Sequence, residues 1–244
     1  MNIGIMVQAR MGSTRLPGKV LKTVLERPLL EYQIERLRYV KGASQLIVAT
    51  TVLPEDDLII NLCKKISTSY YRGSAHHVLA RYYEAASEFK LDHVIRITGD
   101  CPLIDPVVID HVLSYYLSHI QDYDYVSNVI QRSYPRGMDC EIFSMKMLET
   151  AYREAQDTDE QEHVTLFIYR RPERFRLGHV IHKKNMSSYR LTVDTVEDFE
   201  LIYQLIERLY PYNKNFTMED CIECLEKNPR LLSINAHIEQ RLYS

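Results

Sequence analysis

Residues 3–19 read Ile-Gly-Ile-Met-Val-Gln-Ala-Arg-Met-Gly-Ser-Thr-Arg-Leu-Pro-Gly-Lys, an apolar run followed by a basic loop. The apolar run predicts a buried strand. Gly12 and Gly18 let the backbone of the loop approach a ligand closely. Arg10, Arg15 and Lys19 add full positive charges, and the backbone N–H groups of the loop add partial ones. This combination suits a polyphosphate and predicts an α/β enzyme that binds a nucleotide after its first strand.

Two common phosphate-binding loops do not fit this stretch. The P-loop needs four residues between its glycines and a Ser or Thr after its Lys, whereas five residues separate Gly12 from Gly18 and Val20 follows Lys19. Pro17 also fixes the backbone where a P-loop offers successive free N–H groups. The dinucleotide pattern Gly-x-Gly-x-x-Gly is absent. A basic, solvated turn without a ligand is the remaining alternative.

Strands alternate with helices along the rest of the chain, which predicts an α/β fold with a mostly parallel twisted sheet and helices on both faces. The periodicity of the apolar residues predicts strands at 3–9, 46–51, 68–71, 93–98, 123–128, 140–143, 175–181 and 189–194. It predicts helices at 28–40, 55–66, 75–90, 106–119, 145–156, 160–169, 196–209 and 218–227. We expect one domain over residues 1–244, with residues 134–185 as its one irregular insertion.

Two acidic residues follow predicted strands. Asp100 follows the strand at 93–98, and Asp194 ends the strand at 189–194. Ligands of parallel α/β sheets bind beyond the carboxyl ends of the strands, so both acids and the basic loop are expected to converge. Carboxylates are the oxygen ligands that Mg²⁺ takes, and we predict both as metal ligands. The alternatives are a turn residue for Asp100 and a helix cap for Asp194, although Thr195 already fits the cap.

Composition excludes some classes of function. The net charge of −3 argues against broad nucleic-acid binding, for which a basic chain is expected. No apolar run approaches the length of a membrane span, and no secretory signal is visible. The five cysteines are expected to be reduced thiols, which predicts a cytoplasmic protein without a membrane partner. The lone Cys-x-x-Cys at 221–224 lacks the four ligands of a structural zinc site.

The opening loop resembles the start of the cytidylyltransferases that activate acylneuraminate and 3-deoxy-manno-octulosonate. The stretch Arg-Leu-Pro-Gly-Lys at 15–19 is long and unusual in composition. Residues 99–104 (Gly-Asp-Cys-Pro-Leu-Ile) resemble the second motif of these enzymes, and residues 193–198 (Val-Asp-Thr-Val-Glu-Asp) resemble the third. Residues 134–143 and 162–165 resemble a narrower branch, the spore coat polysaccharide biosynthesis protein F family. The resemblance covers essentially the whole chain.

The resemblance implies a nucleotide-diphospho-sugar transferase-like fold and a Mg²⁺-dependent reaction. In that reaction the hydroxyl of a sugar acid attacks the α-phosphate of CTP, which gives a CMP-sugar and pyrophosphate for surface-polysaccharide synthesis. It also implies a homodimer, with 134–185 contributing to the sugar site and the dimer contact. The implied catalytic cations are Arg10, Arg15 and Lys19. The implied nucleotide-binding residues are Ala9, Arg10, Gly12, Ser13, Arg15, Lys19, Arg72, Gly73 and Ser74. The candidate sugar-binding residues are Arg136, Asp139, Glu141, Glu162 and His163.

For some of these residues a purely structural role is the alternative. Arg is apt for a sugar carboxylate, but the loop around Arg136 could equally be a surface bend. His163 has the near-neutral pKa of a general base, but it could equally cap a helix or line an interface. His76 and His77 stand where the narrower branch commonly has acidic residues.

Two other functions remain open. A glycosyltransferase with the same nucleotide-binding architecture is one, although Asp100-Cys101-Pro102 does not supply the Asp-x-Asp expected there. A non-catalytic nucleotide- or glycan-binding protein is the other, and the His76-His77 departure leaves room for it.

Overall fold

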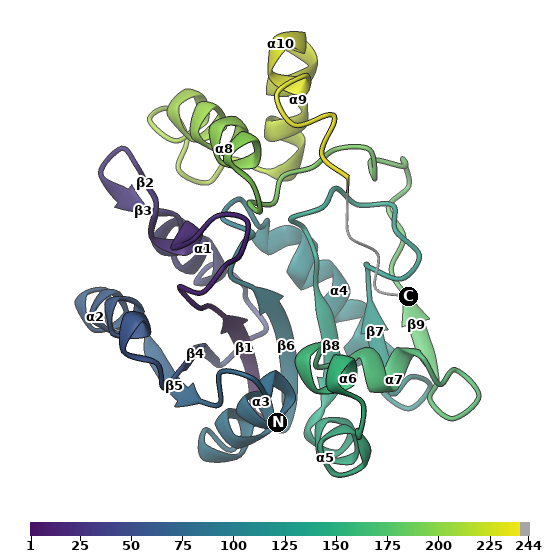
Figure 1. The fold of residues 1–244 in the computed structure, drawn as a ribbon. Coiled ribbons are helices and arrows are strands. Elements are labelled where there is room, and N and C mark those ends of the chain that lie inside the picture. The colour runs from purple at the N-terminus through teal and green to yellow at the C-terminus, as the bar shows by residue number, and fades with distance from the viewer. Residues whose placement is uncertain (240–244) are drawn as a thin grey trace.

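A computed structural model describes residues 1–239 and shows a seven-stranded sheet in the order β5-β4-β1-β6-β8-β7-β9 (Figure 1). The strands are β1 Ile3–Gln8, β4 Gln45–Thr51, β5 Ser69–Gly73, β6 His93–Thr98, β7 Tyr125–Ser127, β8 Glu141–Ser144 and β9 Leu177–His179. The pairs β1–β4, β1–β6, β4–β5 and β7–β9 are parallel, and β8 is antiparallel to β6 and β7. The predicted mostly parallel α/β sheet is confirmed. The last five residues of the predicted domain, 240–244, lie outside the described part.

Helices cover both faces of this sheet. They are α1 Leu29–Leu37, α2 Asp57–Lys65, α3 Val78–Glu88, α4 Pro106–Ser118, α5 Met145–Glu154, α6 Thr158–Glu162, α7 Leu166–Tyr169, α8 Val196–Leu209, α9 Met218–Lys227 and α10 Pro229–Leu232. Short 3-10 helices, η1 Lys19–Leu21 and η2 Pro54–Asp56, and a hairpin of β2 Thr23–Val24 and β3 Arg27–Pro28 complete the fold. None of the helices within residues 1–239 combines the length and the apolar character that a bilayer span requires.

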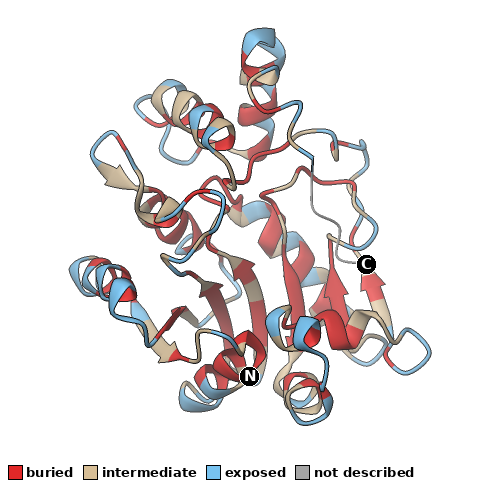
Figure 2. Cartoon of the chain, viewed as in Figure 1, coloured by how far each residue is buried: buried red, intermediate tan, exposed pale blue. Residues whose placement is uncertain are grey.

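The strand pattern explains the two hydrophobic cores. Along β1, Ile5 and Val7 pack into one core with α1, α2, α4, α8 and α9, while Met6 packs into the other with α3, α5 and α7. Side chains alternate across a strand, so a run that is apolar at every position needs a helical layer on each face. Most of the apolar residues of β1, β4 and β6 are accordingly buried (Figure 2). This burial makes the sheet a rigid platform for the loops at its carboxyl edge.

Capping residues set the helix starts at the expected places. Asp105 caps α4 by accepting from Val107 N, with Pro106 at the first helical position. Ser144 caps α5, and Thr195 and Thr217 form capping boxes at the starts of α8 and α9. Each cap satisfies N–H groups that the first helical turn leaves without partners.

The predicted strand at 189–194 is wrong. The backbone of this segment forms hydrogen bonds with two irregular segments instead of with a neighbouring strand. Leu191 N donates to Arg136 O at 2.7 Å, and Val193 N donates to Asp100 O at 2.8 Å. A single bridge joins Arg136 and Arg190. The segment therefore ties the loop at 136 to the end of β6, and places Asp194 beside the sheet edge without joining the sheet.

The predicted helix at 160–169 is also wrong, because it is divided into α6 and α7. His163 has a non-helical backbone, with φ −108° and ψ 76°. Thr165 donates its hydroxyl to the buried Glu141 at 2.6 Å, which turns the chain toward the sheet. Residues 134–185 as a whole, expected to be the irregular insertion, contain β8, α5, α6, α7 and β9.

Candidate active site

One ammonium group joins the three motifs at the carboxyl edge of the sheet. Lys19 Nζ lies 3.0 Å from Asp100 Oδ2 and 2.8 Å from Asp194 Oδ1, and it donates to Val193 O at 2.7 Å. The side chain of Lys19 is 13% exposed, and that of Asp194 14%. Residues 81 and 175 positions apart are thus brought into one cluster. The strand-end rule accounts for Asp100, which follows β6, whereas Asp194 arrives on a segment outside the sheet.

The basic loop folds back on itself to place Lys19. The N–H groups of Ser13 and Gly18 both donate to Met11 O at 2.9 Å. Gly18 has φ 66°, in the left-handed region that a residue with a side chain rarely adopts. This turn starts η1 and aims Lys19 toward the end of β6.

Asp56 anchors the same loop through hydrogen bonds. Its fully buried carboxylate accepts from Met11 N at 2.7 Å and from Thr51 N at 3.1 Å, and Thr51 Oγ1 also donates to it. The carboxylate thereby fixes the backbone one residue after Arg10. Asp56 was not among the predicted site residues, since nothing in its local pattern distinguishes it from a helix-start acid.

We expect Asp56→Ala to lower kcat/KM for the nucleotide by about ten- to hundredfold, because a displacement of about 1 Å in a positioning loop costs that much. Asp56→Asn keeps an acceptor for Met11 N and is expected to recover most of the loss. Steady-state kinetics, compared at temperatures where thermal unfolding shows every variant folded, check this. Equal activity of Asp56→Ala and the wild type would show that the anchor does not position the loop.

Close approach of two strand ends positions Asp100. Gly99 N donates to Gln8 O at 2.8 Å. A Cβ at Gly99 would lie 2.7 Å from Gln8 O and 3.1 Å from the Cβ of Ala9, closer than side chains normally pack. Glycine therefore lets the loop after β6 lie directly against the start of the basic loop.

Asp194 belongs to a larger ion-pair network. It lies 3.1 Å from Arg15 and 2.9 Å from Arg190. Arg190 also binds Asp198 at 2.8 Å, and the buried Asp198 accepts from Asn235 Nδ2 at 2.9 Å. Arg190 and Asn235 were missed in the sequence, because their roles depend on a backbone path that no local pattern encodes. Asp194 does not cap α8, which agrees with the interpretation of Thr195 as the cap.

The electrostatics keep this cluster charged. Burial lowers the pKa of Lys19, but the Asp100 and Asp194 carboxylates outweigh it and the net shift is upward. Burial raises the pKa of Asp100, but Lys19 and neighbouring hydrogen bonds outweigh it and the net shift is downward. The cluster therefore presents an ammonium and a carboxylate at neutral pH.

Residues at the end of α6 approach the basic loop. Arg10 lies 3.6 Å from Glu162, and both side chains are about half exposed. Such an exposed pair contributes little stability and is easily exchanged for a ligand. The adjacent His163 is half-buried, and burial lowers its pKa below the ordinary value of a histidine.

Glu141 was predicted to contact the sugar, but it is buried in the sheet. Its buried carboxylate accepts from Tyr125 Oη and from Thr165 Oγ1, each at 2.6 Å, and pairs with Arg96. Arg96 also donates to Gln8 Oε1 at 3.1 Å. Glu141 therefore holds Arg96 in place, and Arg96 in turn supports Gln8, the last residue of β1 before the basic loop.

The two remaining candidates for the sugar site, Arg136 and Asp139, lie on one loop but differ in their contacts. Asp139 forms a two-pronged pair with Arg132, at 2.6 and 3.0 Å. Arg136 is half-buried and forms no ion pair within residues 1–239. Burial, followed by repulsion from Arg132 and Arg190, lowers its pKa. A partly desolvated guanidinium without a counter-ion is suited to an incoming carboxylate.

The residues after β4 and β5 are held by separate contacts. Arg72 pairs with Asp57 at 2.8 Å and donates to the carbonyls of Thr51 and Leu53. Ser74 O accepts from the buried Arg81 at 2.7 Å. These contacts do not join Arg72, Gly73 or Ser74 to the Lys19 cluster, and their predicted contact with the nucleotide stays a prediction.

The two histidines that depart from the branch pattern begin α3. His77 Nδ1 accepts from Ala80 N at 3.0 Å and so caps the helix, a task that an acidic residue also performs. This contact gives His77 a structural role.

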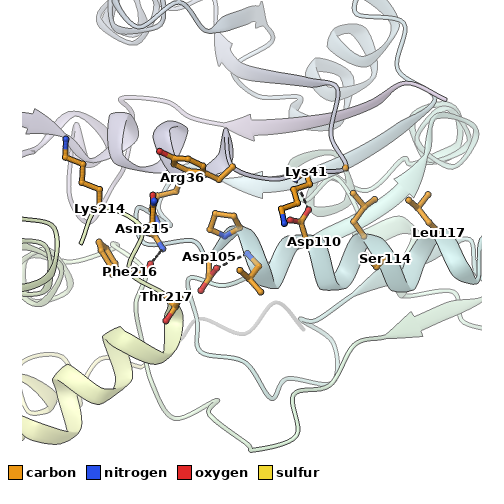
Figure 3. A pocket seen from close by; sticks show the side chains of 15 residues that line it. Arg36, Lys41, Asp105, Asp110, Ser114, Leu117, Lys214, Asn215, Phe216 and Thr217 are labelled. Carbon is orange, nitrogen blue, oxygen red and sulfur yellow. Dashed lines mark hydrogen bonds between the residues drawn. The ribbon is translucent and has the colours of Figure 1, made fainter. Parts of the chain in front are cut away.

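A cavity of about 660 Å³ lies elsewhere, between the end of α1, one side of α4 and residues 214–217 (Figure 3). None of the predicted site residues lines it. Its central charges are already engaged. Arg36 donates to the carbonyls of Ile104 and Phe216, and Asp105 accepts from the N–H groups of Val107 and Met218. This cavity is therefore separate from the Lys19 cluster.

Comparison with known proteins decides the family. The sequence profile of a family described as cytidylyltransferase matches residues 4–228. The chain belongs to the cytidylyltransferase family. The spore coat polysaccharide biosynthesis protein SpsF of Bacillus subtilis (strain 168) is 33% identical over 235 residues, which cover 93% of this chain and 95% of the relative. The predicted resemblance, including the narrower branch, is confirmed, and the chain is a nucleotidyltransferase of this family.

Two solved structures support the fold. A cytidylyltransferase from Leptospira borgpetersenii serovar Hardjo-bovis (strain JB197) is 35% identical with a TM-score of 0.92, and each chain covers 100% of the other. A CMP:2-keto-3-deoxy-manno-octonic acid synthetase solved with CTP is similar at a TM-score of 0.64 and 18% identity, with 85% of this chain and 99% of that chain covered. The second likeness is one of fold, and it confirms the predicted architecture.

Proposed function

We propose that this cytidylyltransferase transfers a cytidylyl group from CTP to a hydroxyl of a sugar acid, with Mg²⁺ as cofactor. The observation that carries the proposal is the convergence of Lys19 and Arg15 with Asp100 and Asp194 at the carboxyl edge of the sheet. The cytosine base and the role in surface-polysaccharide synthesis are supported by the family and by the SpsF relative.

The donor set fits Mg²⁺. Asp100 Oδ2, Asp194 Oδ1 and Val193 O surround one point, which the Lys19 ammonium occupies at 2.7–3.0 Å. Mg²⁺ prefers such oxygens and completes its shell with water and substrate phosphates. Within residues 1–239 no group of three or more His, Cys, Asp or Glu is placed to hold a metal. In the proposed site, two carboxylates hold the ion, and water and the nucleotide phosphates complete its shell.

In the proposed reaction the hydroxyl oxygen of the sugar bonds to the α-phosphorus of CTP. The bond from that phosphorus to the bridging oxygen breaks, and pyrophosphate leaves with its electron pair. Arg10, Arg15 and Lys19 hold the phosphate oxygens, and Ala9, Gly12 and Ser13 bring backbone close to them. Mg²⁺, when bound at Asp100 and Asp194, neutralises charge on the phosphates. Fixed charges act where negative charge grows, so catalysis is chiefly positioning and electrostatic stabilisation.

His163 is the proposed base that removes the proton of the attacking hydroxyl. Arg136 is the proposed contact of the sugar carboxylate, with Asp139 and Glu162 lining the acceptor site. A homodimer through residues 134–185 and a cytoplasmic location stay predictions. The molar mass in solution, by light scattering, checks the former.

The reaction is tested by pyrophosphate release. We expect release from CTP, and much less from UTP, ATP or GTP, with a panel of 3-deoxy sugar acids and Mg²⁺. Binding of CTP in a thermal-shift assay without release from any acceptor would favour a non-catalytic protein. Sugar transfer from a nucleotide-sugar donor without pyrophosphate release would favour a glycosyltransferase. Either result overturns the proposal.

The base role of His163 predicts a pH dependence. Because its pKa is lowered by burial, the imidazole is neutral at pH 7 and can accept a proton. The rate should therefore rise with pH through a value below about 6.5 and then level off. In His163→Asn this acid limb should disappear and the plateau rate should fall by about a hundredfold. Profiles of kcat/KM for the acceptor check this, and an unchanged acid limb in the variant would assign the base elsewhere.

A further inference from the structure

The ammonium of Lys19 has no spare hydrogen. Its three N–H bonds match three oxygen neighbours, on Asp100, Asp194 and Val193, at 3.0, 2.8 and 2.7 Å. The side chain is 13% exposed and lies between the two carboxylates. These are the same oxygens that the proposed function assigns to Mg²⁺. A protein cation therefore lies at the position proposed for the metal.

Two cations cannot use these oxygens at once. Mg²⁺ binds oxygen at about 2.1 Å in a strict octahedral shell, which leaves no space for an ammonium bridging the same two carboxylates. Taking the metal therefore requires Lys19 to release at least one of the two acids. A bridging ammonium competes directly with the ion for its ligands.

The charge balance points the same way. Within residues 1–239, three cations, Lys19, Arg15 and Arg190, oppose three carboxylates, Asp100, Asp194 and Asp198, in one connected network. The charges of these six side chains sum to zero, so a divalent ion alone adds uncompensated charge beside them in a partly buried place. A triphosphate reverses this balance, because it brings excess negative charge that attracts both the ammonium and the ion.

We propose that Lys19 keeps the metal site closed in the free protein, and that the triphosphate opens it by drawing the ammonium from Asp100 and Asp194. This inference rests on the proposed function and adds an order to it, in which the metal enters with the nucleotide or after it. Thermodynamic linkage makes the effect reciprocal, so the nucleotide and the metal each tighten the binding of the other by the same factor.

Metal binding without nucleotide tests the inference, with Mn²⁺ as the probe. Isothermal titration and the electron paramagnetic resonance signal of free Mn²⁺ measure its affinity for the full-length protein. We expect Lys19→Met to bind Mn²⁺ about tenfold tighter or more than the wild type. Lys19→Gln, which also lacks the charge, should behave alike and serves if Lys19→Met does not fold.

Arg15→Met is the matched control. It removes one positive charge from the same Asp194, but Arg15 forms no ion pair with Asp100 within residues 1–239. It should raise Mn²⁺ affinity much less than Lys19→Met, because it lowers repulsion without freeing the bridged oxygens. Equal gains in the two variants would reduce the effect to charge alone and overturn the proposal. Equal Mn²⁺ affinity of the wild type and Lys19→Met would also overturn it.

These outcomes are separate from the fate of the proposed function. If the wild type fails to bind CTP in thermal-shift assays, the proposed function fails, whereas the Mn²⁺ comparison between wild type and Lys19→Met is still measured. If CTP binds and pyrophosphate is released, but Mn²⁺ binds the free wild type as tightly as Lys19→Met, only the closing role of Lys19 fails.

Discussion

Asp100→Asn is expected to lower the rate of pyrophosphate release by about a thousandfold or more while the protein stays folded. The amide keeps the shape of the side chain but removes its negative charge, and with it a ligand for the metal that accompanies the nucleotide. It also removes one of the two carboxylates that hold Lys19, which lies 3.0 Å away. Single-turnover release of pyrophosphate from CTP at saturating acceptor measures the loss.

A matched variant controls for the change in side-chain chemistry. Asp110 lies on α4, where its Oδ1 accepts from Lys41 N at 3.0 Å, away from the Lys19 cluster. Asp110→Asn should therefore keep near-wild-type turnover. Thermal unfolding should show both variants folded at the assay temperature. If Asp100→Asn retains more than about a tenth of the wild-type rate, Asp100 does not hold the metal and the site must be reassigned.

The approach of Lys19 to Asp100 was predictable because it follows from topology. Parallel strands place their carboxyl ends on one edge, so loops after β1 and β6 meet whatever the length of chain between them. Helix starts were predictable for a similar reason. The caps at Asp105, Thr195 and Thr217 act within a few residues, so the sequence contains the whole interaction.

The path of residues 189–194 was not predictable from the amino-acid sequence of this segment. Its apolar and β-branched residues suit an extended backbone. The hydrogen bonds that hold this backbone are formed with Arg136 and Asp100, which are far away in the sequence. Whether an extended segment pairs with a strand or with a loop is decided by what lies beside it. The pattern gave the local conformation, and tertiary contacts gave the partners.

Glu141 shows the same limit for the site. A charged residue in a motif suggests a ligand contact, because charges are rarely buried without a partner. Its partner, Arg96, faces it across the antiparallel β6–β8 pair, a register that becomes visible only in the sheet. The sequence shows which residues are charged, but it does not show which charges neutralise each other inside the fold.

Arg136→Ala should remove most activity toward an acidic acceptor while leaving CTP binding intact. Its guanidinium is half-buried and forms no ion pair within residues 1–239, so a bound carboxylate would be its counter-ion. Losing such a partly desolvated charge pair costs about 2–5 kcal/mol. We therefore expect kcat/KM for the sugar acid to fall by about a hundredfold, which is near the low end of that range. The Kd for CTP, measured by calorimetry, should stay within about twofold.

The acceptor itself supplies the sharper comparison. An amide or ester of the same sugar acid lacks the negative charge, so the wild type should discriminate strongly against it and Arg136→Ala should discriminate little. Arg136→Lys should recover part of the preference, because an ammonium keeps the charge but loses the two-pronged geometry. Arg136 repels its cationic neighbours Arg132 and Arg190, so its removal should not lower the melting temperature. A variant that loses activity equally toward the acid and the neutral analogue would point to a role in shaping the loop, and the carboxylate contact would have to lie elsewhere.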